Sequence, residues 1–441
     1  MFDGEPRSLK VGVLVDLERR DTAGGHVKCW ERIAEAAARA DLSIDLTVHV
    51  QGDRTDIQEL APHVRFVALR PMLSTGRWRS FDVGADQTDL APLHPGLLRH
   101  LWHYDVIHTT DAYFAYAKTA ELASKLWNKP LVTSIHTDTP NYTRVYAERI
   151  LRRLLHSERQ NNRLADWLIH RRRLPEKLAD GMTRKLRRHM RRADWTFVGA
   201  LPEETAGGTH RTSILRRGCD IAHFNPARRD RSWLARQHGI AHATKVVLFV
   251  GRLDDGKGVR LLTLALKRLI EAGEDVVGIF AGRGKESDWI VEQLGAGAIL
   301  LGQVDRDRLA DYYASADLFA FPSEIEISPN VVLEAQASAL ACLVAPNGGG
   351  RFVARDGLDG CVLASRDPAI WAAGMSSILA DDARRQAMGV AARADVQRRH
   401  PSWDQVVLED LYPVWLHCMA RRRGHADGYV QTAPAYSRSA S

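Results

Sequence analysis

The sequence predicts an α/β fold made of two successive Rossmann-like domains. The chain has 441 residues, which is too long for one ordinary domain. Short apolar runs rich in β-branched residues alternate with stretches of helical spacing, as in parallel sheets that helices cover on both faces. The series starts twice with an apolar strand followed by a turn that contains glycine, once at residues 10–16 and again at residues 245–251.

In the first half, the opening strand leads into a turn with Gly24 and Gly25, and a helix is expected over 26–40 because its spacing and composition are helical. A region from about 142 to 192 has helical composition and no strand signal. Apolar runs elsewhere in this half predict strands at 43–50, 64–69, 105–109, 130–136 and 194–199, with a helix at 115–127.

In the second half, the apolar strand at 245–251 is followed by an amphipathic helix at 259–272. The same alternation then continues, with strands expected at 276–281, 298–301, 318–321, 342–345 and 360–363 and helices at 307–316 and 333–340.

These patterns predict four segments. Residues 1–205 form the first domain, with a basic helical segment at about 142–195, and residues 206–400 form the second. Glycine and proline signals at 213–226 indicate a crossing between the domains. Residues 401–423 contain an amphipathic helix at 403–415, and the polar tail 424–441 is expected to be disordered.

Positive charge is concentrated in one part of the chain, whose formal net charge is +7. Residues 151–195 contain 14 Lys and Arg against 5 Asp and Glu, a local excess of +9. Such a segment attracts lipid headgroups, nucleic acid or a phosphorylated substrate, and the alternative is a solvated helix face. Only Trp167 and Trp195 supply aromatic side chains there, which argues against nucleic acid.

The cysteine pattern argues against a disulfide framework or a zinc site, because five scattered cysteines contain no CxxC pair. Residues 1–5 do not resemble a signal peptide, and no apolar run is long enough to span a membrane. A cytoplasmic protein is therefore expected.

Two glutamates, Glu326 and Glu334, are separated by seven residues across the junction of a polar loop and a helix. The start of a helix offers backbone N–H groups and a positive dipole end, which suit phosphate. Carboxylates accept hydrogen bonds from sugar hydroxyls. The pair therefore indicates a nucleotide-sugar site, and the alternative is two unrelated glutamates.

Cationic residues follow the strand at 245–251. Arg252 stands at its end and Lys257 stands before the next helix, where ligands of open α/β sheets bind. These two cations can neutralise a diphosphate, although a solvated turn would have the same pattern. Gly282 and the segment leading to Val304 follow other strands of the same expected sheet, so their turns should meet at one edge.

The order and spacing of these motifs resemble retaining glycosyltransferases of family 4. The motifs are GRLDDGKG at 251–258, AGRGKE at 281–286, YYASADLFAFPSE at 312–324, ExxxxxxxE at 326–334, and a GGG turn followed by RDGLDG. The resemblance covers the second half almost completely. In the first half it covers the Gly24-Gly25 turn, 105–108 and 134–138, and the string 136–146 is similar to lipid-directed members of the family.

The resemblance implies the GT-B architecture, in which two Rossmann-like domains face each other across a cleft. It implies that the first domain binds the acceptor and that residues 401–423 cross back onto it. By the same resemblance, Arg252 and Lys257 would bind the donor diphosphate, Glu326 would contact hydroxyls of the transferred sugar, and Glu334 would contact the ribose. Backbone N–H groups near Asn330 and Val331 would support the donor. His136 would face the donor sugar, and Gly25 would approach the phosphates or the acceptor. Gly251, Gly282 and Val304 complete the expected nucleotide-sugar site.

The expected function is transfer of a hexose, with retention of configuration, from a UDP-, GDP- or ADP-sugar to a hydroxyl of a lipid or glycan, in lipid or polysaccharide biosynthesis. The acceptor would attack from the leaving-group side, so no separate protein base is expected. Arg252, Lys257 and a helix N-terminus would stabilise the leaving diphosphate, so no metal is expected. Residues 151–195 are expected to touch anionic membrane at the inner face of the cell membrane, and no nucleic-acid partner is expected.

Two alternatives remain open at this point. A sugar-nucleotide epimerase or hydrolase could have the same fold. The second alternative is a degenerate module without catalytic activity. It stays open because Ile327, Ser328 and Phe352 depart from the residues usual in the family.

Overall fold

The computed structural model describes residues 8–20, 24–74, 88–154, 166–199, 211–324, 329–347 and 349–424. The chain forms two compact units, one of Met1–Arg216 with Trp403–Ser441 and one of Arg217–Ser402. The boundary expected between 205 and 206 lies too early, because residues 212–214 form a strand of the first unit's sheet. The expected tail falls outside the described residues from 425 onward.

The first unit is built on a sheet whose described strands run in the order β3-β4-β2-β1-β5-β6-β7-β8. All neighbouring strands are parallel except the pair β3 and β4 at one edge. The edge strands β3 and β8 were not predicted from the sequence. The strands are β1 (Leu9–Glu18), β2 (Ile44–Gln51), β3 (Asp56–Ala61), β4 (Val64–Leu69), β5 (Val106–Thr109), β6 (Leu131–Ile135), β7 (Trp195–Val198) and β8 (Thr212–Ile214).

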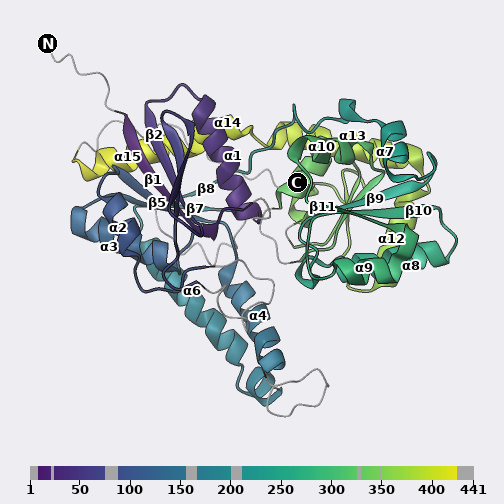
Figure 1. The fold of residues 1–441 in the computed structure, drawn as a ribbon, viewed down its shortest axis with the longest axis horizontal. Coiled ribbons are helices and arrows are strands. Elements are labelled where there is room, and N and C mark those ends of the chain that lie inside the picture. The colour runs from purple at the N-terminus through teal and green to yellow at the C-terminus, as the bar shows by residue number, and fades with distance from the viewer. Residues whose placement is uncertain are drawn as a thin grey trace. The chain divides into compact units, whose positions relative to one another are not determined.

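Helices cover both faces of this sheet (Figure 1). Val11, Val13 and Val15 of β1 belong to one core with α1 and the C-terminal helices, whereas Leu14 belongs to a second core with α2 and α3. This alternation is what a parallel strand buried on both faces requires. The helices are α1 (Gly25–Arg39), α2 (Pro95–Leu101), α3 (Ala115–Trp127), α4 (Thr139–Leu154) and α6 (Leu174–Arg192), with a π-helical turn at Trp167–Arg171 before α6.

The C-terminal segment belongs to the first unit and is not the single regular helix expected at 403–415. It consists of α14 (Trp403–Gln405), a π-helical stretch (Val406–Leu411) and α15 (Tyr412–Arg422). Trp415 is fully buried, and its indole Nε1 donates to Nδ1 of His108 on β5 at 3.1 Å. This buried contact ties the end of the chain to the middle of the first sheet.

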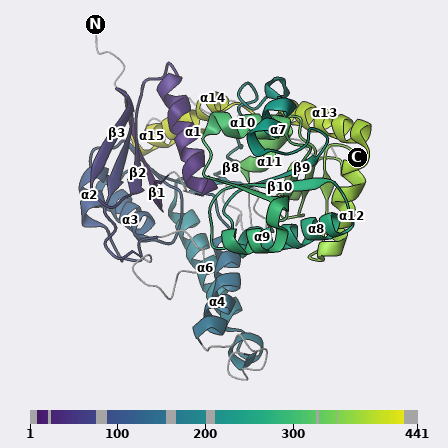
Figure 2. The ribbon, with the colours of Figure 1, turned by 45° about the vertical axis from the view of Figure 1, so that its right-hand side comes forward.

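Helices α4 and α6 lie side by side and extend away from the first sheet (Figures 1 and 2). His189 anchors the C-terminal part of α6, since its Nδ1 lies 2.6 Å from Glu121 of α3 and its Nε2 lies 3.0 Å from Thr109 of β5. Leu186 and Met190 are buried beside it. Most of the basic side chains of α6 are exposed. No helix among the described residues is long and apolar enough to cross a membrane.

The second unit contains a parallel sheet with the order β11-β10-β9-β12-β13-β14 in its described part. Helices α8, α9 and α12 cover one face, and α7, α10, α11 and α13 cover the other (Figure 1). The strands are β9 (Lys245–Val250), β10 (Val276–Ala281), β11 (Ala298–Gly302), β12 (Leu318–Phe321), β13 (Cys342–Val344) and β14 (Cys361–Val362). The α-helices are α7 (Arg231–His238), α8 (Val259–Glu271), α9 (Ser287–Leu294), α10 (Arg306–Ser315), α11 (Asn330–Ala337), α12 (Pro368–Leu379) and α13 (Asp382–Arg399), and short 3-10 turns lie at Pro226–Arg228, Asp255–Lys257, Gly295–Gly297 and Gly349–Phe352.

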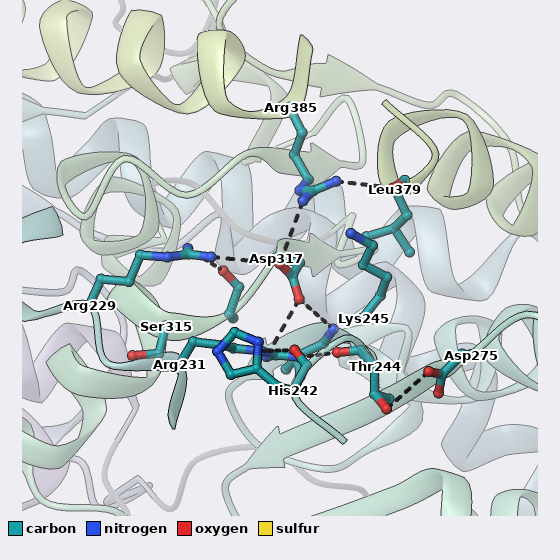
Figure 3. Close-up of polar contacts among 12 residues, drawn as sticks. Arg229, Arg231, His242, Thr244, Lys245, Asp275, Ser315, Asp317, Leu379 and Arg385 are labelled. Atoms are coloured by element: carbon teal, nitrogen blue, oxygen red, sulfur yellow. Dashed lines mark hydrogen bonds and ion pairs between the residues drawn. The ribbon is translucent and has the colours of Figure 1, made fainter. Parts of the chain in front are cut away.

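A buried carboxylate joins several elements at the amino end of this second sheet. Asp317 precedes β12, and its carboxylate accepts from the backbone N–H of Val246 on β9 at 2.8 Å. The guanidinium groups of Arg229, Arg231 and Arg385 point toward it at 3.9, 3.5 and 3.6 Å (Figure 3). Burial lowers the pKa of Arg231, and the charge of Asp317 acts against that effect. Asp317 thus links β9, β12, α13 and the start of α7.

Candidate functional site

Turns at the carboxyl ends of β9, β10 and β11 are hydrogen-bonded to one another in the second unit. The N–H of Gly251 donates to Ala281 at 2.9 Å, and the N–H of Gly282 donates to Gly302 at 2.7 Å. Gly282 has a φ of +147°, and a Cβ there would overlap the carbonyl oxygen of Gly251. Glycine is therefore required at this contact, which holds the turns at one edge of the sheet.

Asp254 organises the turn that carries the two predicted diphosphate-binding cations. Its carboxylate lies 3.1 Å from Nε of Arg252 and accepts from the backbone N–H of Lys257 at 3.2 Å. A Cβ on Gly258, which follows Lys257, would lie 2.7 Å from the carbonyl oxygen of Pro322 after β12. An Asp that caps a short turn in this way is a recognisable sequence signal.

Helix α11 begins near the same edge, since it follows β12. Asn330 is its first residue, and its side-chain Oδ1 is buried without a hydrogen-bond partner among the described residues. Val331 is partly buried against the core, as is Val304 after β11. In the first turn the N–H of Val332 bonds to the carbonyl of Pro329 at 3.2 Å. The N–H groups of Asn330 and Val331 come before any helical carbonyl that they could bond, so this end can receive an anion.

Glu334, one turn into α11, is held by a tyrosine that the sequence analysis missed. The hydroxyl of Tyr313 on α10 donates to Oε2 of Glu334 at 3.2 Å. Tyr313 is fully buried, and burial raises its pKa well above the usual value, with the charge of Glu334 acting in the same direction. Tyr313 therefore stays a hydrogen-bond donor and fixes the carboxylate. No local pattern could reveal this contact, because the residues lie on different helices.

Glu326, Ile327 and Ser328 lie outside the described residues. Phe352, another departure from the family pattern, is a core residue of the second unit and packs edge-on against His400. Its carbonyl oxygen accepts from the side chain of Gln336 on α11 at 3.0 Å.

In the first unit, Gly25 follows β1 and His136 follows β6, two strands that β5 separates in the sheet. Gly25 starts α1, and a Cβ on it would meet no described atom within 4 Å. His136 follows β6, and its ring stacks on that of His26 with centroids 4.5 Å apart. The indole Nε1 of Trp30 lies 3.3 Å from Nε2 of His136.

Two buried carboxyl groups also lie at the carboxyl ends of β1 and β5. Asp16 accepts from the N–H of Tyr116 at 3.0 Å, and Asp111 accepts from the N–H of Tyr113 at 2.8 Å. Burial raises the pKa of both groups, and the proximity of Asp111 raises that of Asp16 further. These carboxyl groups stabilise the loop before α3. Among the described residues, no cluster of His, Cys, Asp and Glu is arranged to hold a metal ion.

Comparisons with known proteins agree with this arrangement. A model of the glycosyl transferases group 1 matches residues 230–395. The D-inositol 3-phosphate glycosyltransferase of Geodermatophilus obscurus is 30% identical over 408 residues, which cover 87% of this chain and 83% of that protein.

Two solved structures have a similar fold. The sucrose-phosphate synthase of Thermosynechococcus elongatus has a TM-score of 0.68 at 20% identity, covering 91% of this chain and 96% of that one. HepE of Anabaena, solved with UDP and glucose, has a TM-score of 0.63 at 19% identity, covering 91% and 99%.

The predicted fold class and family are thus confirmed, and so is the predicted activity, transfer of a sugar from a nucleotide sugar to an acceptor hydroxyl. The same assignment follows from the two parallel-sheet units, from the site motifs, and from a relative that aligns over most of both chains. The chain belongs to the group 1 glycosyltransferases, the retaining hexosyltransferases of family 4 with the GT-B fold.

Proposed function

We propose that the donor is a nucleoside diphosphate hexose bound at the carboxyl edge of the second sheet. The observation that carries the proposal is the turn in which the carboxylate of Asp254 lies 3.1 Å from Nε of Arg252 and accepts from the backbone N–H of Lys257. Two cations on one short turn, near the N-terminus of α11, match the charge of a diphosphate. Glu334, fixed by Tyr313, binds the ribose hydroxyls in this proposal.

The reaction requires negative charge on the departing diphosphate to be stabilised as the sugar leaves. Arg252, Lys257 and the first N–H groups of α11 supply that stabilisation from fixed positions, which is more effective than reorganising water. In the proposed mechanism Glu326 and His136 orient the hexose. The acceptor hydroxyl attacks from the side of the leaving group, so the diphosphate itself receives the proton.

A ligand screen tests the donor assignment directly. UDP, GDP and ADP and their hexose derivatives are added to the protein, and the melting temperature is measured. Because a ligand that binds only the folded state raises stability by mass action, one nucleotide series should raise the midpoint. Stabilisation by none of them would contradict the site. Release of free sugar from the donor without any acceptor would indicate a hydrolase instead.

Replacing Glu334 with alanine should weaken binding of the free nucleoside diphosphate by about tenfold, since a charged hydrogen bond to ribose is lost. Tyr313→Phe should weaken it by roughly threefold, because the carboxylate stays but is no longer held in place. Isothermal titration calorimetry with the nucleotide measures both changes.

Glu326→Ala is the matched control for that experiment, because it removes a carboxylate assigned to the sugar. It should leave affinity for the free nucleotide unchanged and lower the rate of sugar transfer. Equal loss of nucleotide affinity in the Glu326 and Glu334 variants would reject the division of roles.

We also propose that the acceptor carries a phosphate group. The relative named above is a D-inositol 3-phosphate glycosyltransferase, so a phosphorylated polyol is the first acceptor to test. Helix α6 of the first unit exposes Arg184, Arg187, Arg188 and Arg191, which favour anions. A phosphate on a lipid headgroup would satisfy the same chemistry.

If α6 contacts an anionic membrane, reversing the charge of Arg184, Arg187 and Arg188 to Glu should lower partitioning to phosphatidylserine vesicles by on the order of a hundredfold. Sedimentation with vesicles at low salt measures the effect. The control reverses three exposed arginines of the second unit, Arg236, Arg268 and Arg384, which gives the same change in net charge. Equal partitioning of both variants would exclude α6 as the contact.

A further inference from the structure

Arg283 adds a further cation to the edge of the second sheet at which the donor is proposed to bind. It stands shortly after β10, and its carbonyl oxygen accepts from the backbone N–H of Leu253 at 3.0 Å. Leu253 lies between Arg252 and Asp254 in the turn of the predicted diphosphate-binding residues. A Cβ on Gly284 would overlap the carbonyl oxygen of Leu253, so the two turns pack backbone to backbone. The main chain of Arg283 is therefore fixed beside that turn.

The side chain of Arg283 leans toward β11. A Cβ built on Gly302, the last residue of β11, would lie 3.8 Å from Nε of Arg283. Because β10 lies between β11 and β9 in the sheet, this direction leads away from Arg252, which follows β9. It leads toward the turn that contains Val304. Gly302 has a φ of +64° and no side chain, so the guanidinium group of Arg283 lies next to bare backbone at the end of β11.

The guanidinium group of Arg283 is available to a ligand. Arg283 is exposed, and within the part of the chain that the structure describes no hydrogen bond or ion pair holds its side chain. The carboxylate of Glu286, in the same turn, pairs instead with Arg260 of α8 at 2.7 Å. Arg283 thus differs from Arg252, whose Nε lies 3.1 Å from the carboxylate of Asp254.

The position of Arg283 matches the nucleoside end of the donor better than the diphosphate. In the proposed function the diphosphate lies at the turn after β9, and Glu334 binds the ribose. Glu334 accepts from Tyr313 of α10, the helix that follows β11, so the ribose is directed to the β11 side of the site. The base is then the part of the donor that lies nearest Arg283 and Gly302. A guanidinium group is planar and stacks on aromatic faces, which every nucleobase has.

We infer that Arg283 binds the nucleobase of the donor, with its guanidinium plane stacked against the base beside Gly302. The inference rests on the proposed function and adds to it a contact for the base. Stacking tolerates every base, so Arg283 contributes affinity for the donor without selecting among UDP, GDP and ADP.

Isothermal titration calorimetry with two probes tests the contact. One probe is the nucleoside diphosphate found by the ligand screen, and the other is pyrophosphate, which lacks the nucleoside. Arg283→Ala should weaken binding of the nucleoside diphosphate by about tenfold and leave pyrophosphate binding unchanged. Arg283→Lys keeps the charge but loses the plane, so it should lose nearly as much. Both variants keep the carbonyl that bonds to Leu253. Arg236→Ala, at an exposed arginine of α7, should change neither affinity.

Kinetics provide the second measurement. A stacking contact is the same in the ground state and the transition state, so Arg283→Ala should raise the KM for the donor about tenfold and leave kcat unchanged. A fall in kcat, or an equal loss of pyrophosphate affinity, would place Arg283 on the phosphates and overturn the inference. Unchanged nucleotide affinity in Arg283→Ala, or full affinity in Arg283→Lys, would overturn it as well. If no nucleotide binds the unchanged protein, that result counts against the proposed function instead.

Discussion

Replacing Arg252 with alanine should lower kcat/KM for sugar transfer by about two to three orders of magnitude while the protein stays folded. The loss of one fixed charge-stabilising donor at a developing anion has an effect of this size. Arg252 is only partly buried and lies 3.1 Å from Asp254. Its removal leaves the turn capped by the bond from the backbone N–H of Lys257 to Asp254. Steady-state rates with the donor found by the ligand screen measure the change.

Three further variants sharpen this result. Arg252→Lys keeps the charge but loses the planar fork, and its rate should lie between those of the unchanged protein and the alanine variant. Lys257→Ala should cause a loss of similar size. The double alanine variant should lose less than the product of the two, since both cations act on one leaving group. Arg236→Ala, at an exposed arginine of α7, is the control for loss of a charge.

Transfer at an unchanged rate by Arg252→Ala would place the diphosphate away from this edge of the sheet. A loss of rate accompanied by a large drop in melting temperature would show that Arg252 is needed for folding, which would also contradict the assigned role. The two measurements together separate binding of the leaving group from stability of the turn.

The sequence predicted the buried strands well because parallel strands covered on both faces are continuous apolar runs. β10 and β12 have the predicted bounds, Val276–Ala281 and Leu318–Phe321. β3 was missed because all but one of its residues are exposed at a sheet edge and show no apolar alternation. β8 was missed because its three residues are too few to make a pattern.

The sequence could suggest candidate site residues only in turns that follow strands, as with Arg252 and Lys257. Parallel strands bring such turns to one edge whatever their separation in the sequence. Two contacts of candidate residues, from Tyr313 to Glu334 and from Trp30 to His136, join side chains of different elements. Periodicity and spacing describe one element at a time, so these partners could be identified only from the structure.

Replacing Asp317 with alanine should lower the stability of the second unit by about 3–5 kcal/mol, because it leaves buried guanidinium groups without their shared counter-ion. Asp317 and Arg385 are each only 7% exposed, and their charged groups lie 3.6 Å apart (Figure 3). The substitution also removes the acceptor for the N–H of Val246 on β9. A melting midpoint about 10 °C lower is expected from differential scanning calorimetry.

Asp382→Ala is the matched control, because Asp382 also pairs with Arg385, at 2.6 Å, but is 60% exposed. An exposed pair contributes little, so this variant should lose less than about 1 kcal/mol. Asp317→Asn keeps an acceptor for Val246 and removes only the charge, so its stability should lie between the two. If Asp317→Ala is no less stable than Asp382→Ala, the three arginines do not depend on this carboxylate. Hydrogen exchange should show the loss in β9 and β12, the strands that Asp317 joins, and through them at the turns that hold Arg252 and Lys257.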